Sequence, residues 1–198
     1  QWSRILRCLG RMRDDYNTPP KDAAYWYGER ALTGLIAAAG WMLNGWSLEE
    51  FTGLRWKGKQ VKVAKGDAWV ELGGVTFTIE AKVKWPRDSS LENWQNQVEN
   101  GIAQALQQLK DLDSAYKAGT IKTAVCYLVP QIHISNFTKN SRELISTFKK
   151  LPVAVHNAQT IAASYWYPRN PPKFKHPDDG KFYVCPGLVV VARFWERT

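Results

Sequence analysis

The chain has 198 residues, of which 44% are hydrophobic and 23% charged, and its net charge is +9. This composition predicts a folded protein with a substantial core and excludes a disordered chain. No apolar run approaches the roughly 18 residues of a membrane-spanning helix, and the first residues, QWSRILRCLGRMR, lack the pattern of a secretory signal. We therefore expect one cytoplasmic domain over 1–198 that does not enter a membrane.

The positive charge favours a polyanionic partner. Lys and Arg number 27 against 18 Asp and Glu, and they are spread along the chain rather than gathered in a tail. Such a surface predicts nucleic acid as the first partner and an acidic membrane surface as the second. The wide spacing of Cys8, Cys126 and Cys185 favours buried free thiols in a reducing compartment. The three histidines show no paired spacing, which disfavours a zinc site.

Four segments precede the centre of the chain. A short helix is expected near 2–12, and a longer helix, rich in Ala and Leu, from Asp22 to Gly40. The run from Ser47 to Glu50 has the spacing of a capping box and predicts a short helix or turn. Residues 54–64 predict a strand pair or a single kinked strand.

Glu29 lies at the edge of the apolar arc of the longer helix, on the same side as Leu32 and Ile36. A carboxylate there is partly desolvated and requires a partner. Two kinds of partner are open at this point. One is a neighbouring arginine, such as Arg30 or Arg55, and the other is a metal ion.

Residues 66–82, GDAWVELGGVTFTIEAK, predict a β-hairpin around which the fold is organised. The pair Gly73-Gly74 suits a two-residue turn that needs positive φ. In the register that this turn sets, Asp67 falls opposite Glu80, and both lie on the face that carries Lys82. Directly opposed carboxylates repel each other, so this pair requires a cation between them.

The triplet Glu80-Ala81-Lys82 carries no weight by itself, because about one or two acid-x-Lys triplets are expected by chance in such a chain. A second triplet, Asp179-Gly180-Lys181, lies in a Pro- and Gly-rich segment and predicts only a turn. The first triplet has a strand, an apolar reverse face and a second acid opposite it. The alternative for it is a solvated polar sheet face without chemistry.

A long helix is expected over 91–118, followed by a buried central strand over 121–129. Three glutamines, Gln97, Gln104 and Gln108, lie beside the apolar stripe of this helix. They form either a solvated flank or a row in which one amide contacts the reacting phosphate or an attacking water.

The last third of the chain gives a weaker pattern. A helix is expected over 140–151, a basic, proline-rich loop over 165–179 and a closing strand over 187–195. We find no internal repeat and no second domain.

This order of elements resembles that of the PD-(D/E)xK nuclease superfamily, which has the restriction-endonuclease-like fold. The matching residues are Glu29 on the first long helix, Asp67 at the start of one hairpin strand and Glu80-Ala81-Lys82 on the next. Gly66 stands where the name of the motif has proline. The resemblance covers about 22–130 and implies an α/β core in which helices flank a central mixed β-sheet.

The resemblance also implies roles for these residues. Asp67 and Glu80 would bind Mg²⁺ or Mn²⁺, with the backbone carbonyl of Ala81 as a further ligand. Lys82 would orient or activate the attacking water, and Glu29 would assist directly or through a water. Gln104, or else Gln108, would match a helix glutamine that some members of the superfamily use.

The function expected from the sequence is that of a metal-dependent nuclease. DNA is favoured over RNA, and the type is an endonuclease of restriction, defence, mobile-element or toxin systems. One alternative is a DNA-binding module on the same fold whose cleavage site is unused. Another is a protein that binds acidic lipid surfaces, which no strongly amphipathic basic helix supports. The sequence is compatible with a homodimer.

Overall fold

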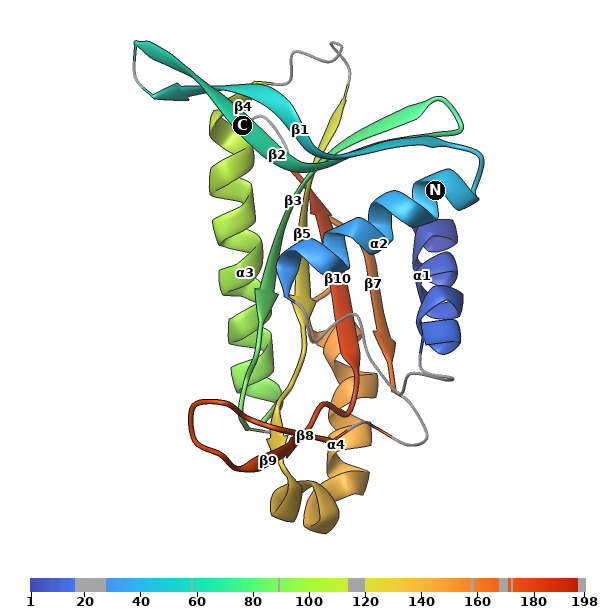
Figure 1. Cartoon of the computed structure of the whole chain (residues 1–198), viewed down its shortest axis with the longest axis vertical. Coiled ribbons are helices and arrows are strands. Elements are labelled where there is room, and N and C mark those ends of the chain that lie inside the picture. The colour runs from blue at the N-terminus through green and yellow to red at the C-terminus, as the bar shows by residue number, and fades with distance from the viewer. Residues whose placement is uncertain are drawn as a thin grey trace.

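The computed structural model describes residues 1–16, 28–57, 59–88, 90–113, 120–157, 159–167, 171 and 173–195. Its elements, labelled in Figure 1, are α1 (Trp2–Tyr16), α2 (Glu29–Met42), β1 (Trp46–Lys57), β2 (Gln60–Leu72), β3 (Val75–Lys84), α3 (Leu91–Asp111), β4 (Leu112–Asp113), β5 (Ile121–Leu128), β6 (Ile132–His133), α4 (Ile134–Ala154), β7 (Thr160–Trp166), β8 (Lys173–Lys175), β9 (Phe182–Val184) and β10 (Leu188–Phe194).

Seven strands form one mixed sheet in the order β4-β1-β2-β3-β5-β10-β7, and β6, β9 and β8 form a smaller sheet. In the large sheet β3 and β5 pair in parallel, whereas the other ladders are antiparallel. The parallel pair needs a crossover connection, and α3 provides it. The predicted α/β class, with helices on a central mixed sheet, is confirmed.

The central strands of the sheet are buried on both faces. Alternate residues of β5 point to opposite sides, so Val125 and Tyr127 pack with α1 and α2, whereas Ala124 and Cys126 pack with α3 and α4. The strand predicted over 121–129 is therefore a central one, as expected. Figure 1 shows α2 lying across one face of the sheet and α3 running along its other side.

The diglycine hairpin forms in the expected register. Gly73 and Gly74 have φ values of 59° and 77°, and the β2–β3 ladder runs from Leu72–Val75 to Ala68–Ile79. The ladder stops one step before Asp67 and Glu80 would face each other. This early end of the ladder defines the candidate site described below.

The prediction of a short helix or turn at Ser47 is wrong. Ser47 and Glu49 belong to β1, where they pair with Val70 and Ala68 of β2. The Ser47 hydroxyl donates a hydrogen bond of 2.7 Å to the carbonyl of Ala37 in α2 instead of capping a helix. Long-range pairing with β2 thus overrides the local capping pattern.

Two helix boundaries also differ from expectation. The second helix starts at Glu29, directly after Gly28, whose φ of 89° is not helical, and it ends at Met42 rather than at Gly40. Its expected start at Asp22 lies outside the described residues. The third helix ends at Asp111 and the chain enters β4, while 114–119 lie outside the described part.

The C-terminal third contains more regular structure than the sequence predicts. The fourth helix spans Ile134–Ala154 and has a non-helical residue at Asn140, where two helical segments join. The segment expected as a loop over 165–179 includes the end of β7 and the whole of β8. The expected closing strand is β10, which lies inside the sheet between β5 and β7.

Cys8, Cys126 and Cys185 are buried free thiols, as expected. Burial raises the pKa of the Cys126 thiol to about 12. Within the described residues, no helix combines the length and the apolar character needed to cross a membrane.

Arg193 of β10 joins the sheet to α3. Arg193 is 4% exposed, and its guanidinium donates two hydrogen bonds of 2.6 Å to the carboxylate of Glu99 and one to the carbonyl of Val155. This bidentate geometry is the strong form of an Arg–carboxylate pair.

Replacing Glu99 with Gln should therefore destabilise the protein, because it leaves a buried guanidinium without its counter-charge. Glu99 is half-exposed, so we expect a loss of about 1–2 kcal/mol rather than the full cost of breaking a buried pair. The melting temperature should fall by roughly 2–8 °C. Glu143→Gln, an exposed glutamate of α4, is the matched control. Equal melting temperatures for both variants would contradict this account.

Candidate active site

The candidate site lies where β2 and β3 separate. Their ladder ends at Ala68–Ile79, whereas β3 continues beside β5 as far as Lys84 and β2 stays paired with β1 back to Gln60. The edge of β3 from residue 80 onward is therefore not paired with β2, and its backbone groups need other partners. Figure 1 shows β2 turning away from β3 at this fork.

Asp67 supplies one of these partners. Its carboxylate oxygen Oδ2 accepts a hydrogen bond of 2.7 Å from the backbone N–H of Ala81. A carboxylate acceptor makes this bond stronger than the neutral ladder bond that it replaces. The hairpin thus brings Asp67 onto the Glu80–Lys82 segment, at the backbone of Ala81.

Lys82 occupies the same edge of β3. Its ammonium nitrogen donates to the carbonyl oxygen of Ala81 at 2.5 Å and to Oε1 of Glu29 at 3.0 Å. Glu29 is the first residue of α2, where the helix dipole also favours a carboxylate. One chain of contacts therefore links Asp67, Ala81, Lys82 and Glu29.

The partner of Glu29 is a residue that the sequence did not suggest. Lys82 pairs with Glu29, whereas Arg30 pairs with Glu50 at 2.9 Å. The side chain of Arg55 lies outside the described part. The expectation of an arginine partner is therefore wrong for Arg30.

Strand alternation places Glu80 on the face of β3 that packs against α3, the same face to which it assigns Lys82 and Lys84. Glu80 pairs with Ala124 of β5, and Ala124 belongs to the core under α3. The Glu80 side chain is almost fully buried, with 2% of its surface exposed. A carboxylate at this depth requires compensation by hydrogen bonds or by a cation.

No group of three or more His, Cys, Asp or Glu side chains close enough to hold a metal ion occurs in the described part of the chain. The expected ligands Asp67, Glu80 and Glu29 are therefore not gathered into such a group. What the fold does gather at the fork is Asp67, the Ala81 backbone, Lys82 and Glu29.

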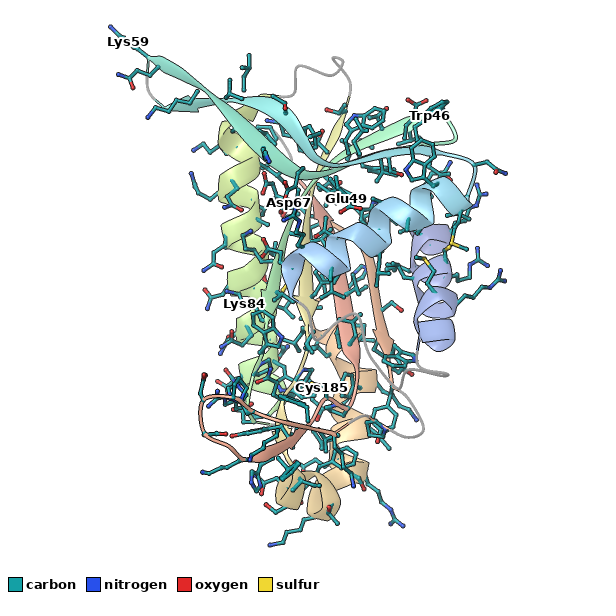
Figure 2. All side chains as sticks on the ribbon, viewed as in Figure 1. Trp46, Glu49, Lys59, Asp67, Lys84 and Cys185 are labelled. Carbon is teal, nitrogen blue, oxygen red and sulfur yellow. The ribbon has the colours of Figure 1, made fainter. Side chains whose placement is uncertain are left out.

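An acidic cavity opens beside this chain of contacts. It has a volume of about 210 Å³ and is lined by Glu29, Arg30, Thr33, Glu49, Glu50 and Asp67. Figure 2 shows the side chains of Asp67 and Glu49 close to each other beside α2. None of the ion pairs between described residues includes Glu49 or Asp67. As far as the described residues show, these two carboxylates add negative charge to the cavity that no ion pair balances.

Glu50, in contrast, is neutralised by two cations. A hydrogen bond from Lys65 at 3.0 Å and the nearby charge of Arg30 lower the pKa of its carboxyl. Its φ of 45° places it in the left-handed region, which is unusual for a residue other than glycine. Glu50 thus lines the cavity as a carboxylate that is already paired. Glu49 and Asp67 are the lining carboxylates that have no ion pair among the described residues.

The buried Tyr127 of β5 is affected by the negative charges of Asp67 and Glu29. Its hydroxyl donates a hydrogen bond of 3.2 Å to the carbonyl of Leu32. Burial raises the pKa of Tyr127 well above its ordinary value, and the charges of Asp67 and Glu29 raise it further. Both carboxylates are therefore close enough to act on one buried phenol.

Gln104 extends the site along β3. Its side-chain oxygen accepts a hydrogen bond of 2.8 Å from Nζ of Lys84, and Lys84 is two residues after Lys82. The oxygen Oε1 of Gln108 is buried and has no hydrogen-bond partner in the described part. Of the candidate glutamines, Gln104 is thus the one held by a cation of the Glu80–Lys84 strand.

Two residues of the site escaped the sequence analysis. Lys84 has the same strand period as Glu80 and Lys82, so alternation could have singled it out. Glu49 gave no such signal, because its segment has the pattern of a capping box. Its place at the cavity follows from the pairing of β1 with β2.

The close packing around Gly66 accounts for glycine rather than proline before Asp67. A side-chain carbon at Gly66 would overlap the ring of Phe51 and approach Leu112 at 3.1 Å. A larger residue here would therefore require the buried Phe51 ring to shift.

The chain matches no protein-family model, and the searches of curated proteins and of solved structures returned no match for it.

Gly34, in the middle of α2, gives a test of how firmly Glu49 is held. A side-chain carbon at this position would meet only the end of Glu49, with Oε2 at 3.2 Å. Gly34→Ala should raise the free energy of unfolding by about 0.5–1 kcal/mol through helix propensity, because the flexible carboxylate can move aside. We expect the melting temperature to rise by roughly 1–4 °C.

Gly101→Ala in α3 is the control, because a carbon there would meet the buried Sγ of Cys126. That variant should melt at a lower temperature than the wild type. A lower melting temperature for Gly34→Ala as well would mean that Glu49 is fixed against α2.

Proposed function

We propose that this protein is a divalent-metal-dependent nuclease with a restriction-endonuclease-like core, acting as an endonuclease on DNA. The observation that carries the proposal is the arrangement at the fork, where the Asp67 carboxylate and the Lys82 ammonium bind the two backbone groups of Ala81. The element order α2-β1-β2-β3-α3-β4-β5, with β5 parallel to β3, supports it, because the sequence resemblance implies the same order apart from the two-residue strand β4.

The oxygen atoms at the fork suit a hard divalent cation. Mg²⁺ and Mn²⁺ prefer carboxylate and carbonyl oxygens, and the fork offers Asp67, Glu29 and the Ala81 carbonyl beside an acidic cavity. The Lys82 ammonium lies between the Glu29 carboxylate and the Ala81 carbonyl, where a metal ion would bind. We propose Asp67, Glu80 and the Ala81 carbonyl as ligands, with Glu29 assisting directly or through a water.

The residues of the chain can then be assigned roles. The N–H of Ala81 holds Oδ2 of Asp67, so the second oxygen, Oδ1, is not used in this bond. With a cation bound at the Ala81 carbonyl, Lys82 would leave that oxygen and keep its contact with Glu29. In that position the ammonium can hold a water and offset charge that develops on the phosphate. The bound ion supplies polarisation of the phosphate and a lower pKa for its bound water.

The proposed role of Gln104 is substrate contact. Because its amide is held by Lys84, two residues beyond Lys82, it lies further along the open edge of β3. Its N–H₂ group is a donor that suits a phosphate oxygen of the bound strand. Lys84 contributes a positive charge at the same place.

Asp67→Asn tests the proposal sharply, because asparagine keeps an oxygen that can accept the Ala81 N–H bond while it removes the charge. With supercoiled plasmid and Mg²⁺ or Mn²⁺, we expect the wild type to nick or linearise the DNA. Asp67→Asn, Glu80→Gln and Lys82→Ala should each lower the cleavage rate about 100-fold or more. The rate is measured from the loss of supercoiled plasmid on gels.

The control variants are Glu143→Gln and Lys149→Ala, exposed residues of α4, which should cleave like the wild type. Equal cleavage by all variants would refute the assigned site. Salt-dependent DNA binding that persists in EDTA without any product from the wild type would favour the alternative of a DNA-binding module.

A further inference from the structure

β1 and β2 continue past the fork as a two-stranded arm, defined here as residues 52–57 and 59–65. The pairing runs from Thr52–Lys65 to Lys57–Gln60. Figure 1 shows the arm projecting past the end of α3, and Figure 2 places Lys59 at its far end. β4 pairs with the arm at Leu54 and Arg55, in the middle of its β1 strand.

The arm is basic and exposed. Between Phe51 and Gly66 the sequence has five basic residues and no acidic one. Lys59 and Lys62 are exposed, and so is the apolar Val63, at 76%. A two-stranded ribbon without a hydrophobic layer of its own is marginally stable in water. An exposed ribbon of one charge sign is therefore suited to a polyanionic partner that covers it.

We propose that the arm enters the major groove of double-stranded B-form DNA and contacts the phosphates on its sides. The proposal rests on the nuclease function proposed above and names the form of its substrate. The major groove of B-DNA, about 12 Å wide, admits a two-stranded β-ribbon. The major groove of A-form RNA is deep and narrow, so side chains cannot read it. The shape of the arm therefore selects duplex DNA.

The arm and the candidate site are continuous through β2. Lys62 precedes Asp67 by five residues and Lys59 precedes it by eight. At about 3.3 Å per residue, they lie roughly 17 Å and 26 Å along the strand from the site. With about 3.4 Å per base step, the arm covers about eight base pairs on one side of the bond to be cleaved.

Lys65 is a separate case at the base of the arm. Its ammonium pairs with Glu50 at 3.0 Å, on the wall of the acidic cavity. This exposed pair links β2 to β1 at the base of the arm. Lys59 and Lys62 are therefore the lysines to test for contact with DNA.

The test is a binding measurement in EDTA, where cleavage is prevented. Fluorescence anisotropy with a DNA duplex of about 20 base pairs, longer than the reach of the arm, compares the wild type with the double variant Lys59→Ala/Lys62→Ala. Loss of two phosphate contacts should weaken binding about tenfold or more at roughly 0.1 M salt. It should also reduce the slope of log affinity against log salt by about 1.8. Binding to an RNA duplex should change much less.

Lys149→Ala/Lys150→Ala, two exposed lysines of α4, removes the same charge elsewhere and should leave duplex affinity and slope unchanged. If the arm variant binds duplex DNA like the wild type, or if the wild type binds no duplex, the arm proposal is overturned. If binding depends on the arm but the wild type cleaves no DNA with Mg²⁺ or Mn²⁺, the nuclease function fails and the arm remains a DNA-binding element.

Discussion

The separation of β2 from β3 is the constraint on which the rest of the site depends. While two strands stay paired, their backbone groups satisfy each other and leave nothing for a ligand. Once β2 leaves with β1, the N–H and carbonyl of Ala81 are open to side chains, and Asp67 and Lys82 take them. The same departure of β2 creates the projecting arm. One divergence of two strands therefore produces both the candidate site and the surface next to it.

Electrostatics at the fork follow from this geometry. Several carboxylates converge on a small cavity, and the Lys82 ammonium bridges Glu29 and a backbone oxygen. Carboxylates at such spacing repel unless a cation lies among them. In the structure a lysine fills this need in part, and Glu49 and Asp67 remain as anions without an ion-pair partner in the described residues. An ion that replaces the ammonium would gain these ligands and free the lysine.

Local sequence signals anticipated the features that local geometry determines. The diglycine turn sets the register of the hairpin, and the apolar run over 121–129 identifies a buried strand. Counting residues from the turn brought Asp67 to the Glu80–Lys82 segment, but counting cannot show that the strands part at Ala68 and Ile79. The contact of Lys82 with Glu29 spans 53 residues, and no local pattern encodes it. The capping-box pattern at Ser47 gave a wrong prediction, because the pairing of this segment with β2 decides its structure.

The central claim is that the fork holds a divalent ion between Asp67 and the Ala81 carbonyl. The most direct measurement is the anomalous difference density of a crystal of the full chain soaked with Mn²⁺. The account predicts a peak within coordination distance of the Asp67 carboxylate and the Ala81 carbonyl oxygen, with Lys82 displaced from that oxygen toward Glu29. A crystal that shows no peak at the fork, with Lys82 still on the Ala81 carbonyl, would contradict it.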